Sequence, residues 1–120
     1  MISSLLQAAL GGAIGASLRF LVSGGVAFPF GTLLVNVVGS FVMGLAFVFL
    51  AEHRGLERWI PFVMAGMLGG FTTFSAFSLD ALKLYEAGRI GAAAAYVLAS
   101  VGVSLAALIL AVLLARNWPA

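Results

Sequence analysis

Charged residues divide this sequence into long uncharged stretches. No charged side chain occurs within residues 1–18, 20–51, 59–79 or 90–115. A helix needs about 20 apolar residues to cross the hydrocarbon core of a bilayer. The stretch 20–51 is too long for one helix, and its Ser-Gly-Gly sequence followed by Pro29 indicates a turn. The pattern therefore predicts four transmembrane helices, at about residues 4–25, 31–51, 59–84 and 89–115.

The composition excludes a water-soluble domain. Hydrophobic residues make up 63% of the chain and charged residues only 8%, whereas about a quarter of the residues in soluble domains are charged. So few polar side chains cannot cover the surface of a small globule, and a disordered chain would be far more polar. Short connections favour antiparallel neighbours. We therefore expect one all-α membrane domain, residues 1–120, embedded in a lipid bilayer.

Several classes of function are excluded in the same way. The six basic residues are scattered rather than clustered, so no nucleic-acid partner is expected. The chain has no cysteine and one histidine, His53, which excludes a thiolate or histidine-based metal site. No nucleophile–base pair or carboxylate pair falls within the predicted helices, so we do not expect an enzyme.

The charges on the predicted loops are evenly distributed. If the N-terminus is cytoplasmic, three basic residues lie on that side and three on or toward the other: Arg54, Arg58 and Arg116 against Arg19, Lys83 and Arg89. The positive-inside rule then has no bias on which to act. The chain could insert in both orientations, and two opposed copies would pair about a twofold axis in the membrane plane. The alternative is a single topology fixed by other features.

Uncharged polar residues occur at membrane depth on two helical faces. Each set has the spacing i, i+4, i+8: Thr32, Asn36 and Ser40 on the second helix, and Tyr96, Ser100 and Ser104 on the fourth. Polar groups in lipid are costly unless they are paired or line a wet path. These hydrogen-bond donors are consistent with an ion path. The alternative is a structural role, in which they bond to their own helix or to a neighbouring helix.

The third helix carries a sequence that disfavours a continuous helix. Residues 69–78 are Gly-Gly-Phe-Thr-Thr-Phe-Ser-Ala-Phe-Ser, in which glycine and β-branched residues predict a break. Backbone groups freed at this depth must be buried in protein, line water or bind an ion. Phe74 and Phe77 share one face. Their positive ring edges would attract a small anion weakly, as conduction requires, although core or lipid packing is the alternative.

Three charged residues near helix ends have simpler interpretations. Arg19 is expected either to snorkel to the headgroups or to place positive potential at a vestibule. Asp80 and Lys83, at i and i+3, are expected to pair with each other.

Together these motifs resemble the Fluc (CrcB-type) family of small fluoride channels, over nearly the whole chain. The resemblance rests on Gly-Gly-Ala-Ile-Gly-Ala at 11–16 followed by Arg19, Gly-Thr-Leu-Leu-Val-Asn at 31–36, the 69–78 segment, and Tyr96 with Ser100. It implies an antiparallel, dual-topology homodimer with two pores that passively exports fluoride from the cytoplasm. The expected location is the inner or plasma membrane of a microbe, where the channel would confer fluoride resistance.

The resemblance also implies roles for individual residues. Asn36 corresponds to the polar pore asparagine, and Phe74 and Phe77 to paired phenylalanines whose ring edges face fluoride. The other residues implied on the pore path are Thr32, Ser75, Tyr96, Ser100 and Ser104.

A structural sodium ion and a vestibule arginine are implied as well. The carbonyls of Gly69 and Thr72 from both copies would surround the sodium ion at the dimer centre, and Arg19 would be the vestibule arginine. The sequence departs from the family at two positions. Ala76 stands where threonine is common, and Asp80 stands where glutamate is expected, so its shorter reach weakens a pore role for this carboxylate.

Two other functions compete with the channel. A small multidrug exporter also has four spans, but it needs an acidic residue in its first helix, and the first acid here is Glu52 in a predicted loop. A purely structural membrane subunit, assembled through its many glycines, would carry no ion flux.

Overall fold

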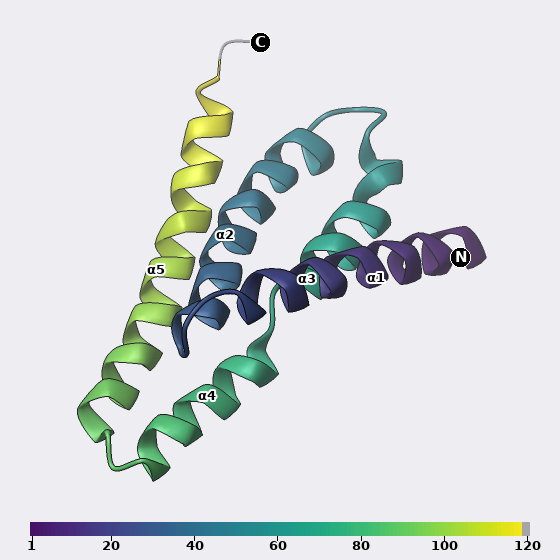
Figure 1. Cartoon of the computed structure of the whole chain (residues 1–120). Helices are drawn as coiled ribbons and strands as arrows, with labels where there is room; N and C mark the ends of the chain where they lie inside the picture. Colours follow the sequence, from purple (N-terminus) through teal and green to yellow (C-terminus); the bar gives the residue numbers. More distant parts are fainter. Residues whose placement is uncertain (119–120) are drawn as a thin grey trace.

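A computed structural model describes residues 1–118, and the spans predicted from the sequence are helical (Figure 1). Four helical segments are long and apolar enough to cross a membrane, and no strand occurs in residues 1–118. The elements are α1 (Ile2–Gly24), α2 (Phe30–Ala46) with its π-helical continuation η1 (Phe47–Ala51), η2 (Glu57–Trp59), η3 (Pro61–Leu68), α3 (Gly69–Phe71), α4 (Phe74–Glu86) and α5 (Ile90–Arg116). The all-α, four-span prediction is confirmed.

The third span is broken between α3 and α4. Thr72 has φ −88° and ψ 157°, and Thr73 has φ −152° and ψ 122°, so both residues are extended. The chain then resumes as α4 in a different direction (Figure 1). The break falls within the segment 69–78, where the sequence predicts it.

Glycines allow the helices to pack backbone against backbone. A Cβ added at Gly15 of α1 would collide with the carbonyl oxygen of Met67 in η3, and one at Gly66 would lie 2.9 Å from the carbonyl oxygen of Ala8. Gly44 brings α2 equally close to α5. Small residues at such crossings are the usual basis of helix association in lipid. The result is a slab of 51 × 33 × 22 Å, whose short dimension is about two helix diameters of about 10–12 Å each.

We expect Gly15→Ala to lower the free energy of unfolding by about 1–3 kcal/mol, because the added methyl group must push η3 away from α1. Gly102→Ala is the matched control. Gly102 is exposed on α5 and has no neighbouring atom within 4 Å of an added Cβ. Thermal unfolding in detergent would measure both variants, and equal melting temperatures would contradict the packing role.

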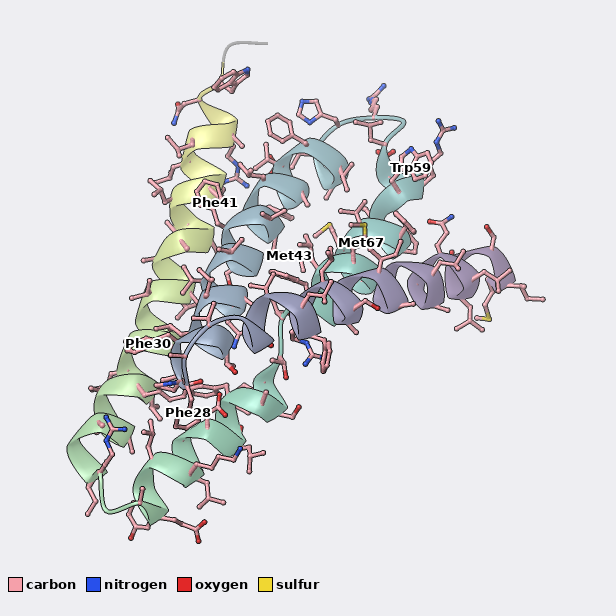
Figure 2. The ribbon with its side chains drawn as sticks, in the orientation of Figure 1. Phe28, Phe30, Phe41, Met43, Trp59 and Met67 are labelled. Atoms are coloured by element: carbon pink, nitrogen blue, oxygen red, sulfur yellow. The ribbon has the colours of Figure 1, made fainter. Side chains whose placement is uncertain are left out.

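The two ends of the slab carry aromatic and charged side chains. Figure 2 shows Trp59 and Phe28 near opposite ends, and both are about half exposed. At the Trp59 end, Arg116 of α5 binds Glu52, with 2.6 Å between Nη2 and Oε2 and 3.2 Å between Nε and Oε1. Tryptophan and arginine at such an end are typical of a membrane–water interface.

The hydrogen bond from Arg116 lowers the pKa of Glu52 below its usual 4.5. A lowered pKa in the folded state means that the ion pair stabilises the protein above pH 4.5, and that this contribution is lost as the pH falls through the lowered value. We therefore expect Glu52→Gln to have a slightly lower melting temperature than the parent chain at pH 7. The difference should disappear in acid, and a difference that persisted at low pH would point to another cause.

Candidate functional site

The break in the third span is held by Asn36 of α2. Its Nδ2 donates to the carbonyl oxygen of Thr73 at 3.0 Å, and its Oδ1 accepts from the Thr73 N–H at 2.7 Å. We call this pair of hydrogen bonds the Asn36 clamp. It satisfies both backbone groups of an extended residue, much as a neighbouring strand would. An amide nitrogen carries two hydrogens, so one N–H of Asn36 is left for another partner.

The clamp changes the partners of the carbonyls around the break. In a continuous helix the carbonyl of Gly69 would accept from the N–H of Thr73, and that of Thr72 from the N–H of Ala76. Here the Thr73 N–H binds Asn36, and the Ala76 N–H binds Oγ1 of Thr73 at 3.1 Å. Both carbonyls therefore lack their helical donor. Carbonyls at a helix break are typical ligands of sodium, so Gly69 and Thr72 fit the cation that the resemblance implies.

Arg19 also reaches the break. Its Nε donates to the carbonyl oxygen of Gly70 at 3.0 Å, where α3 ends and a positive charge is favourable. This side chain is therefore directed to the interior of the bundle, and the expectation that it snorkels to the headgroups is wrong. The freed carbonyl is a nearer partner than the headgroups. Without Arg19, the basic residues divide three against two between the ends, which is still close to balanced.

A groove of about 340 Å³ opens beside the break, and we call it the groove. Its wall includes most of the residues predicted for the pore: Asn36, Thr72, Phe74, Phe77, Ser100 and Ser104. Met43 of α2, labelled in Figure 2, also lines it. The hydroxyl oxygens of Ser100 and Ser104 are buried and have no hydrogen-bond partner within residues 1–118. The groove thus combines an apolar wall with unused polar groups.

The two phenylalanines lie together at the start of α4. Their ring centroids are 5.5 Å apart, and the planes are tilted by 56°. Phe77 is only 8% exposed and also lies 5.5 Å from the ring of Tyr96, whereas Phe74 is 77% exposed. Phe77 therefore forms a fixed wall between the groove and Tyr96, and Phe74 projects from the surface of the single chain.

A second recess, of about 260 Å³, lies on the other side of these rings and is lined by Thr32, Ser23, Phe28 and Asp80. Thr32 is thus apart from the groove. Asp80 is 7% exposed, and its Oδ2 accepts from the hydroxyl of Tyr96 at 3.2 Å. The amine of Lys83 lies 5.9 Å from the ring centre of Phe28 instead, so the expected Asp80–Lys83 pair is wrong. Despite its short side chain, Asp80 reaches Tyr96.

Sequence reasoning missed one residue of this site, Thr73. It is clamped by Asn36, caps α4 through the Ala76 N–H and lies 3.2 Å from the hydroxyl of Ser75, oxygen to oxygen. Threonine directly before a helix is a typical N-cap. Placing the restart of the helix after the second threonine of the 69–78 segment would have identified it.

The chain matches a known family over most of its length. The family model described as "CrcB-like protein, Camphor Resistance (CrcB)" matches residues 6–112. The chain belongs to the CrcB-like family.

Similar proteins in the family carry one descriptive name. A protein of Cereibacter sphaeroides is 61% identical, with 100% of each chain covered, and one of Ruegeria sp. is 54% identical, with 98% of each chain covered. A protein of Roseobacter denitrificans is 50% identical, covering 95% of this chain and 96% of the relative. All three are named "Fluoride-specific ion channel FluC".

Proposed function

We propose that this protein is a passive, fluoride-selective ion channel of a microbial membrane and not an enzyme. The names of relatives up to 61% identical over the full chain support this function. The observation that carries the proposal is the pair of buried, unpartnered hydroxyls of Ser100 and Ser104, which lie in one groove with Phe74 and Phe77.

The groove has the chemistry that a conducted fluoride ion needs. Fluoride in water is held by hydrogen-bond donors, and hydroxyl and amide groups replace such donors inside a protein. The serine hydroxyls and the second N–H of Asn36 supply them here, and the edges of the phenylalanine rings add weak positive potential. No basic side chain lines the groove. Binding is therefore weak enough for the ion to leave as well as to enter.

We propose that a second copy in the opposite orientation completes the pore. Phe74 is 77% exposed beside a groove that is open on one side, and a close partner would cover both. The near balance of basic residues between the two ends permits insertion in either orientation. A twofold axis would create two equivalent pores, with one groove in each. The Gly69 and Thr72 carbonyls of both copies would meet at a central sodium ion.

The driving force for export is the membrane potential. Fluoride enters an acidified cell as neutral HF and ionises in the cytoplasm. A negative interior potential then drives the anion out, at about 2.3 kcal/mol per charge for each 100 mV. Tyr96, Asp80 and Thr32 would line the continuation of the path beyond Phe77. This function requires the inner or plasma membrane.

Two rival functions make different predictions. A multidrug exporter needs a carboxylate within the membrane near its first helix, and α1 has no acidic residue. A structural subunit needs no polar groove and predicts no flux.

The deciding experiment is efflux from liposomes that contain the purified protein, measured with a fluoride electrode and a chloride electrode in parallel. Fast fluoride release without chloride release supports the channel. An intact protein that releases no fluoride would favour the structural subunit, and equal release of both ions would contradict selectivity.

A further inference from the structure

The start of α4 offers two backbone N–H groups that no residue of the described chain uses. The first N–H groups of an α-helix have no partner within the helix. In α4 the third of them, on Ala76, binds the side chain of Thr73. Within residues 1–118, the N–H groups of Phe74 and Ser75 have no hydrogen-bond partner.

This helix start faces the groove. Thr73 and Phe74 are both in its wall. Ser100 enters the same groove from α5, is 5% exposed, and has a hydroxyl without a partner. A buried polar group without a partner costs about 1–3 kcal/mol. The hydroxyl is thus a second, independent indication that a hydrogen-bonding ligand belongs here.

The position of these donors is fixed. The Asn36 clamp holds Thr73 through both of its backbone groups, and Thr73 in turn caps α4. The helix dipole adds roughly half a positive charge at this end. Fixed N–H groups and a positive dipole end are the usual components of an anion site at a helix start.

We propose that the N–H groups of Phe74 and Ser75, together with the hydroxyl of Ser100, form a binding site for a small anion at the start of α4. The inference rests on the proposed function and identifies a station for fluoride within the groove. Phe74 then contributes its backbone as well as its ring. The break in the third span thereby serves two ions, since its carbonyl side fits a cation and its N–H side fits an anion.

The first test compares Thr73→Asp with Thr73→Asn. Both residues are good N-caps and are nearly the same size, but aspartate places a negative charge beside the two N–H groups. The proposal predicts that Thr73→Asn conducts fluoride nearly as the parent chain does. Thr73→Asp should conduct about tenfold less and need a higher fluoride concentration for half-maximal flux. Equal flux through the two variants would overturn the site.

A second variant tests the N–H group itself. Replacing Phe74 with phenyllactic acid, its α-hydroxy analogue, keeps the ring and exchanges the backbone N–H for an ester oxygen. We expect about a tenfold loss of fluoride flux from the loss of this hydrogen bond. Unchanged flux would overturn the site even if Thr73→Asp failed to fold. Failure of the proposed function is distinguishable, because the parent chain itself would then release no fluoride.

Discussion

Replacing Asn36 with alanine is expected to abolish fluoride efflux and to destabilise the protein. The change removes the Asn36 clamp, so the N–H and the carbonyl of Thr73 lose their partners at membrane depth. Each buried group left unpaired costs about 1–3 kcal/mol. The start of α4, and with it Phe74, would also lose its fixed position. Liposome efflux and thermal unfolding would measure the two effects.

Asn117→Ala is the control for this experiment. Asn117 binds the carbonyl oxygen of Leu113 at the exposed end of α5, far from the groove residues in sequence, and its loss should leave efflux unchanged. A chain with Asn36→Ala that still conducted at the parent rate would contradict both the clamp and the pore role of Asn36. That result would be expected of a purely structural subunit.

Replacing Phe74 or Phe77 with isoleucine is expected to reduce fluoride efflux by about tenfold, because the positive ring edge is lost while a large apolar side chain is kept. Ring interactions of this kind are worth about 0.5–1.5 kcal/mol, and about 1.4 kcal/mol corresponds to tenfold. Phe77→Ile should also lower stability, since Phe77 is 8% exposed and packs on Tyr96. Phe74 is largely exposed in the single chain, so its replacement should affect flux alone.

The same substitution at Phe30 provides the control. Phe30 is 58% exposed at the start of α2 and lines neither the groove nor the second recess. Phe30→Ile should leave efflux near the parent rate. Full conduction by both Phe74→Ile and Phe77→Ile, with protein shown to be folded, would remove the phenylalanines from the pore.

The positions of the polar side chains were only partly predictable. Spacing along α2 and α5 correctly grouped Asn36 with Ser40 and Ser100 with Ser104, and all four line the groove. The same spacing grouped Thr32 with Asn36, but Thr32 lies in the second recess. A helical face extends the whole length of its helix, whereas Phe77 and Tyr96 divide the neighbouring space in two. The pore roles of these residues stay predictions.

The sequence by itself determined the membrane class, the four spans and the site of the break, because each depends on a short window of neighbouring residues. Uncharged stretches specify spans, and Gly69 to Thr73 disfavour a helix whatever surrounds them. Only the tertiary structure decided the partners: Arg19 with Gly70, Asn36 with Thr73, and Asp80 with Tyr96 rather than Lys83. These contacts join separate helices. They depend on how closely the glycine crossings bring the helices together, which no local window of sequence contains.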